Sequence, residues 1–282
     1  MSPPLPKPSP AFEAIPSLDA FEARYAKGQP QVVWARLVAD LETPVSAYMK
    51  LTGAGSDGSK GLSFLLESVE GGASRGRYSV IGLDPDLVWR ARGNAAEINR
   101  TPQTKPEAFK TEVKPTLSSL RALLAESRLD LPAELPPMAA GVFGYMGYDT
   151  IRLVEHLPNE RPDSLHVPDS VMIRPTLIVI FDTVRDEMTL VTPVRPDGKT
   201  PAEKAYKAAL KRLKGAIAAL DAPISHPALS TKKLATPEPK SNTTPAEYLA
   251  MVAKAKEYIR AGDIFQVVLS QRFSAPFPLA SF

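Results

Sequence analysis

Hydrophobic and polar residues alternate along this chain with two periodicities, one typical of helices and one typical of strands. Helical spacing of apolar residues, with a terminating Gly28 after the first segment, predicts helices over residues 17–27, from Thr43-Pro44 onward, and over 114–127, 202–220 and 245–261. Runs rich in β-branched and aromatic residues predict strands over 31–41, 62–69, 78–82, 87–91 and 265–273, and a hairpin of 178–181 with 188–191. Clustered strands, local hairpins and intervening helices favour an α+β fold built on an antiparallel sheet.

The last of these helices has the clearest predicted boundaries. Thr244 can cap it, Pro245 suits the first helical position, and Gly262 suits its end. Its apolar stripe consists of Tyr248, Met251, Val252, Ala255 and Ile259. Strand composition resumes directly afterwards, close to the last residue, Phe282. A helix followed by the start of a sheet indicates that a second domain opens here.

Proline marks the predicted boundaries between domains. The chain has 29 prolines in 282 residues, about twice the average share of ~5%. Six of them fall within residues 1–16, which predicts an extended and disordered Pro-rich arm. A second region rich in Pro, Ser, Thr and Lys reads as a linker. The predicted organisation is an arm (1–16), a first domain (17–221), a linker (222–244) and the start of a second domain (245–282).

Two separate motifs resemble one enzyme family. Residues 258–272, Tyr-Ile-Arg-Ala-Gly-Asp-Ile-Phe-Gln-Val-Val-Leu-Ser-Gln-Arg, resemble the opening of the chorismate-binding domain of anthranilate synthase component I. Far upstream, Leu65-Leu66-Glu67-Ser68, followed after ten residues by Ser79, resembles the tryptophan feedback motif of the same family. The resemblance runs from about Ser17 to the end of the chain. It implies that 17–221 is a regulatory, tryptophan-binding domain and that 245–282 begins an α+β chorismate-binding catalytic domain.

The resemblance also implies an activity, a metal and partners. The family converts chorismate and ammonia, or glutamine through an amidotransferase subunit, to anthranilate and pyruvate with Mg²⁺. This is the first step of tryptophan biosynthesis and is inhibited by tryptophan. The family's acid/base residue and Mg²⁺ ligands are expected beyond Phe282, so no metal ligand is nominated here. The chain is therefore expected to be an N-terminal fragment that is inactive alone.

Two alternatives stay open at this point. One is the aminodeoxychorismate synthase component I, which aminates chorismate at C4 and retains the pyruvyl group. The Leu-Leu-Glu-Ser spacing and Gln266 favour anthranilate synthase over it. The other is an amino-acid-binding regulatory module without catalysis.

Glu67 and Ser68 are the candidate effector-binding residues. Alternation along their predicted strand places the two side chains on opposite faces. A carboxylate in such an apolar run is costly to bury unless it meets a cation, so an ion pair with Arg75 or Arg77 is one interpretation. The resemblance implies another, in which Glu67 meets the α-ammonium group of tryptophan and Ser68 hydrogen-bonds the ligand. Ser79 and Arg77 would then support these two residues.

Gln266 is the candidate residue near chorismate. Related enzymes that add water at C2 of chorismate resemble this segment but carry lysine at this position as a general base. A neutral amide cannot activate water in that way, whereas ammonia is already a nucleophile. Glutamine therefore fits ammonia-dependent chemistry under the resemblance, although Gln266 could equally satisfy only the edge of a strand.

Three further patterns carry little functional signal. Residues 53–60 superficially resemble a phosphate-binding loop, but Ser59 stands where lysine should follow the second glycine. The spacing of Gly141, Gly144 and Gly147 favours close backbone packing over dinucleotide binding. The histidines form no triad or metal spacing, and we assign them no role.

Composition narrows the partners, the kinds of site and the cellular locations that are still open. The 34 basic and 31 acidic residues are interspersed and give a net charge of +3, which disfavours a nucleic-acid partner. The absence of cysteine excludes disulfides and thiolate metal sites. No apolar run approaches the ~18 residues of a membrane helix, and the N-terminus lacks a signal-peptide core. We therefore expect a cytoplasmic protein that does not enter a membrane.

Overall fold

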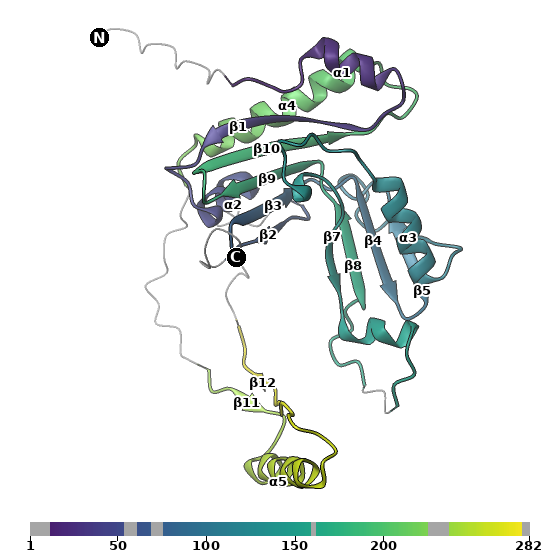
Figure 1. Ribbon diagram of the computed structural model, residues 1–282, viewed down its shortest axis with the longest axis vertical. Helices are drawn as coiled ribbons and strands as arrows, with labels where there is room; N and C mark the ends of the chain where they lie inside the picture. Colours follow the sequence, from purple (N-terminus) through teal and green to yellow (C-terminus); the bar gives the residue numbers. More distant parts are fainter. Residues whose placement is uncertain (1–11, 54–60, 69–75, 159–161, 225–236, 278–282) are drawn as a thin grey trace. The chain divides into compact units, whose positions relative to one another are not determined.

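The computed structural model describes residues 12–53, 61–68, 76–158, 162–224 and 237–277. The chain forms two compact units, residues 1–227 and 228–282. Helices and antiparallel strands make up both, which confirms the α+β prediction (Figure 1).

The first unit contains a five-stranded antiparallel sheet in the order β1-β10-β9-β3-β2. Its strands are β1 (Gln31–Val38), β2 (Phe64–Leu66), β3 (Tyr78–Leu83), β9 (Leu177–Asp182) and β10 (Glu187–Val194). The predicted hairpin is confirmed, because β9 pairs with β10 in a register that sets Glu187 opposite Asp182. The two outer strands, β1 and β2, lie at opposite sides of this sheet.

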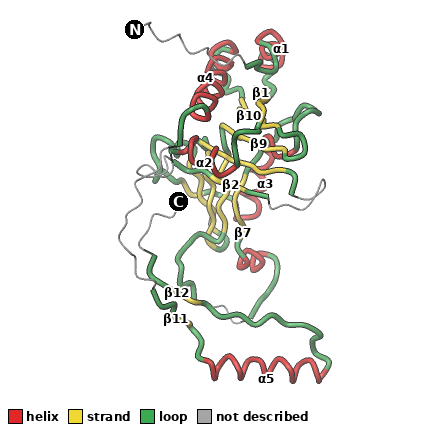
Figure 2. The backbone as a smooth tube through the Cα atoms, turned by 90° about the vertical axis from the view of Figure 1, so that its left-hand side faces the viewer, coloured by secondary structure: helices red, strands yellow, loops and turns green. Residues whose placement is uncertain are grey.

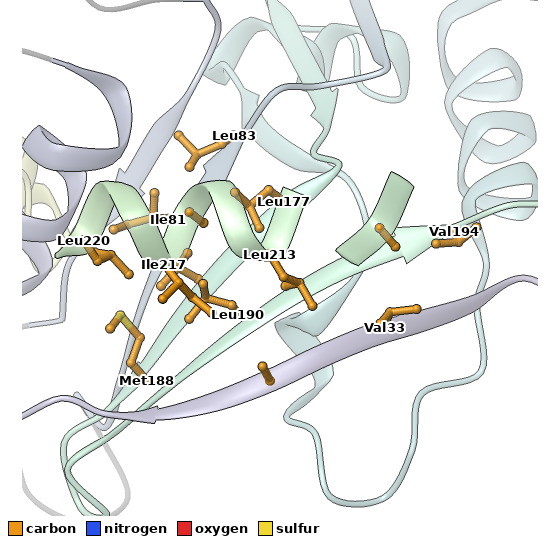
Figure 3. Packing of buried hydrophobic residues seen from close by; sticks show 14 of the residues in the cluster. Val33, Ile81, Leu83, Leu177, Met188, Leu190, Val194, Leu213, Ile217 and Leu220 are labelled. Carbon is orange, nitrogen blue, oxygen red and sulfur yellow. The ribbon is translucent and has the colours of Figure 1, made fainter. Parts of the chain in front are cut away.

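Three helices cover one face of this sheet, namely α1 (Leu18–Tyr25), α2 (Pro44–Thr52) and α4 (Ala202–Leu220) (Figures 1 and 2). The apolar residues of α4 recur every three or four positions, so one stripe meets the sheet. Leu213 and Ile217 of α4 pack against Leu190 of β10 in the main core (Figure 3). All three side chains are at least 97% buried, which accounts for the placement of the helix.

The opposite face of the sheet carries a smaller core under the irregular segment 129–140, called the covering segment below. Trp34, Val80 and Ile180 are buried there together with Leu135 and Ala139. The short 3-10 helix η1 (Pro137–Ala139) belongs to this covering segment.

A second five-stranded antiparallel sheet has the order β6-β5-β4-β8-β7. Its strands are β4 (Leu87–Arg92), β5 (Ala95–Asn99), β6 (Lys110–Thr111), β7 (Phe143–Met146) and β8 (Ser170–Arg174). Helix α3 (Thr116–Ser127) packs on it through Leu120 and Leu123. Trp89 is fully buried in this core, and its Nε1 donates to Ser119 Oγ at 2.9 Å. A further 3-10 helix, η2 (Tyr148–Leu153), follows β7.

The second unit contains α5 (Pro245–Ala261) and a short ladder of β11 (Lys240–Ser241) with β12 (Phe273–Ser274). The predicted limits of α5 are confirmed. Thr244 and Glu247 form a capping box, and Gly262 ends the helix at a φ of 81°.

Two predicted strands are wrong in extent. The strand expected over 265–273 is reduced to Phe273–Ser274, because a strand needs a hydrogen-bonded neighbour and only Lys240–Ser241 provides one in the described chain. The strand expected over 62–69 is ladder-paired only at Phe64–Leu66. Beyond Leu66, side-chain hydrogen bonds replace the backbone pairing.

Candidate functional site

Ser68 lies just after β2, at the edge of the first sheet. Here hydrogen bonds of the Ser68 and Ser79 hydroxyls replace the backbone pairing of β2 with β3. The Ser68 hydroxyl donates to the Tyr78 carbonyl oxygen at 2.6 Å. The Ser68 amide in turn donates to Ser79 Oγ at 3.0 Å. Ser79 is only 2% exposed, so its hydroxyl is fixed within the sheet. The structure thus brings Ser68 and Ser79 together.

Glu67 forms no ion pair with Arg77, one of the two partners considered for it. Its side chain is exposed, and Arg77 instead binds Asp182 through Nε to Oδ1 at 2.8 Å and Nη2 to Oδ2 at 2.6 Å. Arg77 is held there because Asp182 is opposite Tyr78 in the β3–β9 register. The alternative partner, Arg75, lies outside the described residues. Exposure to water removes the burial penalty that motivated the ion-pair prediction.

The Arg77–Asp182 pair shifts the ionisation of both groups. The hydrogen bond from Arg77 lowers the pKa of Asp182, and amide donors at Val184 and Arg185 act in the same direction. The hydrogen bond to Asp182 raises the pKa of Arg77. Arg77 also lies 4.9 Å from the centroid of the Tyr78 ring, a cation–π contact. Tyr78 is therefore contacted twice, at its ring by Arg77 and at its main-chain carbonyl by Ser68.

A polar cavity of about 190 Å³ adjoins this ion pair. Its lining includes Arg77, Tyr78 and Asp182, together with Arg36 of the outer strand β1 and Glu187 of its neighbour β10. Sequence reasoning missed Tyr78 and Asp182 as parts of this region. Asp182 and Arg77 are 105 positions apart, and nothing in the local pattern indicates their pairing.

Gln266 belongs to the second unit, and its side chain is exposed. The residues around it form no strand, although the segment ends in the β11–β12 ladder. Asn242 and Arg272 hold that end of the segment in place, since the backbone amide of Asn242 donates to the carbonyl oxygen of Arg272 at 2.9 Å. The role of Gln266 stays a prediction.

The other sequence patterns have structural explanations or fall outside the described chain. A Cβ on Gly144 would lie 1.8 Å from the carbonyl oxygen of Val171, so this glycine permits the close approach of β7 and β8. Residues 54–60 of the loop-like motif and His226 are outside the described residues. His156 and His166 are exposed. Within the described ranges, no cluster of three metal-ligating side chains is present and no helix could cross a membrane.

Comparison with known proteins gives the wider context of this fold. A family model described as chorismate binding enzyme matches residues 71–282. Anthranilate synthase component 1 of Cereibacter sphaeroides is 47% identical over 266 residues, covering 94% of this chain and 52% of that protein. The Synechocystis protein of the same name is 37% identical over 92% of the chain and 51% of its own length.

A solved structure shares the fold. The crystal structure of anthranilate synthase component I from Streptococcus pneumoniae superposes with a TM-score of 0.57 at 23% identity, covering 87% of this chain and 49% of that one. The α+β architecture is therefore shared with about half of that protein's length. The chain belongs to the chorismate binding enzyme family, and it spans about half the length of the curated relatives it matches.

Proposed function

We propose that this chain is the N-terminal part of a cytoplasmic anthranilate synthase component I. The whole protein would be a lyase that converts chorismate and ammonia, or glutamine through an amidotransferase subunit, to anthranilate and pyruvate with Mg²⁺. The observation that carries the proposal is the 47% identity to the Cereibacter protein over 94% of this chain. Residues 17–221 would form the regulatory domain, with 245–282 beginning the catalytic one.

The hydrogen-bonding groups at Ser68, on the β2–β3 edge of the first sheet, support tryptophan as the effector. A hydroxyl has one donor and two acceptor lone pairs. The Ser68 donor is engaged by Tyr78 O, so its oxygen is left to accept a hydrogen bond from a ligand N–H. The exposed Glu67 carboxylate, next in the chain, can attract an ammonium group. An effector bound here would act by favouring one of two conformations of the enzyme.

Gln266 supports ammonia as the nucleophile. Its amide cannot serve as the general base that water attack at C2 requires. The aminodeoxychorismate synthase reaction is the second candidate, because it uses the same substrate and nucleophile. It differs in the product, which keeps the pyruvyl group. A non-catalytic amino-acid-binding module is the third candidate.

The decisive experiment supplies the full-length gene product with chorismate, ammonia and Mg²⁺, and follows anthranilate by fluorescence and pyruvate by a coupled assay. Both products should form and tryptophan should inhibit, whereas the 282-residue chain alone should be inactive. Aminodeoxychorismate without pyruvate would support the second candidate. Tryptophan binding without turnover by the full-length product would support the third.

The effector site has its own test in the same protein. Ser68→Phe should raise the tryptophan concentration for half-inhibition at least about tenfold, equivalent to about 1.4 kcal/mol, while turnover stays near the parental value. Ser118→Phe, an exposed serine on α3, is the matched control and should leave inhibition unchanged. Superposed inhibition curves for Ser68→Phe and the parent would mean that tryptophan binds elsewhere.

A further inference from the structure

A cavity at the outer edge of β1 has no part in the proposed function. Its volume is about 240 Å³, and its walls come from α1, β1 and the segment 130–134. A water molecule occupies roughly 30 Å³ of liquid, so the cavity has room for a ligand of several heavy atoms. Apolar side chains of the lining are those of Ile15, Pro16, Ala20, Val32 and Pro132, together with the Trp34 ring.

Two residues lining this cavity carry buried polar atoms without hydrogen-bond partners among the described residues. Trp34 is 3% exposed, and its indole Nε1 has no acceptor. Gln31 is also 3% exposed, and its Nε2 donates to Phe21 O at 2.9 Å, which fixes the amide orientation. Its Oε1 is then left without a donor. A buried polar atom without a partner is unfavourable, and a ligand offering both a donor and an acceptor would satisfy these two.

Three charged side chains line the same cavity, namely Arg24 from α1 with Asp130 and Glu134 from the covering segment. In the described chain none of the three forms an ion pair. The covering segment is fixed in place, since Arg36 Nη2 donates to Glu134 O at 3.0 Å and the Leu135 amide donates to Pro132 O at 3.1 Å. One cation and two carboxylates around an apolar wall complement a zwitterion with an apolar side chain.

We infer that this cavity binds a small apolar α-amino acid. Its carboxylate lies toward Arg24 and accepts from the Trp34 indole, and its ammonium group lies toward Asp130 and Glu134. The side chain rests on Ile15 and Val32. Because β1 and β2 are the two outer strands of the sheet, this site is separate from the Ser68 edge. The inference does not depend on the proposed function.

Indole resonances in ¹⁵N NMR spectra of the 282-residue chain provide the test. The chain has two tryptophans, and Trp34→Phe assigns them by the signal that disappears. L-Leucine is the probe, at concentrations up to about 10 mM, well above a Kd of about 1 mM. We expect the Trp34 indole signal to shift and the Trp89 signal, already bonded to Ser119, to stay in place. An unmoved Trp34 signal overturns the inference.

Ligand and protein variants test the proposed orientation. Arg24→Gln should weaken L-leucine binding about tenfold but leave leucinamide, which lacks the carboxylate, unaffected. Arg24→Lys should restore part of the affinity, and Arg121→Gln, on the exposed face of α3, is the matched control. Binding of 4-methylpentanoate or 3-methylbutylamine as strong as that of L-leucine would overturn the inference, because only the apolar wall would then be recognised.

Discussion

Arg77 and Asp182 form an ion pair with two hydrogen bonds, of 2.8 and 2.6 Å. The pair joins the residue before β3 to the last residue of β9. The next residue, Tyr78, accepts the hydrogen bond from Ser68. The β9–β10 turn is tied to the same carboxylate through the Val184 amide at 3.1 Å. A single carboxylate therefore fixes both the turn and the strand beside the candidate effector site.

Asp182→Asn should destabilise the chain by about 1–2 kcal/mol. The Asp182 side chain is 13% exposed, so its loss leaves the Arg77 guanidinium partly desolvated without a counter-charge. The free energy of unfolding is measured by urea denaturation, with one m-value shared by the parent and the variants. Glu97→Gln is the matched control, since Arg90–Glu97 is also an ion pair across neighbouring strands, with 36% and 39% exposed side chains. It should cost less than about 1 kcal/mol. Equal losses for the two variants would contradict the role given to burial.

Gly144→Ala should destabilise by about 3 kcal/mol or more. The new Cβ would lie 1.8 Å from Val171 O, and a backbone carbonyl in a sheet cannot move aside as a flexible side chain can. Gly215→Ala in α4 is the control, because nothing lies within 4 Å of its Cβ position. That change should stabilise by about 0.5–1 kcal/mol through helix propensity. Thermal unfolding of the two variants should therefore move in opposite directions from the parent.

Asp197 should titrate far below an ordinary aspartate. Hydrogen bonds from the Thr200 amide at 2.7 Å, the Lys199 amide at 2.9 Å and the Thr200 hydroxyl at 2.8 Å lower its pKa to about 2. Its contribution to stability is present above the unfolded value of about 3.9 and is lost as the pH falls through about 2. Carboxyl ¹³C titration measures it. Thr200→Val removes the hydroxyl donor and should raise the pKa, so an unchanged titration would contradict this cause.

Local signals in the sequence account for the elements that were predicted well. The limits of α5 follow from Thr244, Pro245 and Gly262, whose cap geometries depend only on neighbouring residues. The β9–β10 hairpin likewise follows from two apolar runs around a polar turn. The strand expected around Gln266 was wrong because strand formation depends on a partner that composition does not reveal.

The candidate site was predictable only in part. The Leu-Leu-Glu-Ser motif and the later Ser79 pointed to residues that the structure does bring into contact, at Ser68 and Ser79. The partner of Arg77 was not predictable, because Asp182 is distant in sequence and reaches Arg77 through strand order. The sequence also does not reveal that buried polar atoms of Gln31 and Trp34 lack hydrogen-bond partners, since burial is a property of the packed fold.

Gln266→Lys should depress anthranilate formation by the full-length gene product at least about tenfold, which corresponds to about 1.4 kcal/mol in the activation barrier. Under the proposed function, lysine would bring a base and a positive charge to a position suited to a neutral amide, and a weak isochorismate-forming side reaction with water is expected. Gln266 is exposed in the 282-residue chain, so the substitution should leave the unfolding of that chain unchanged. Thermal unfolding of the full-length variant, measured beside its activity, separates a catalytic effect from a folding effect. Gln271→Lys, another exposed glutamine of the same segment, is the matched control and should retain most activity. Parental turnover by a folded Gln266→Lys protein would show that Gln266 does not discriminate ammonia from water chemistry.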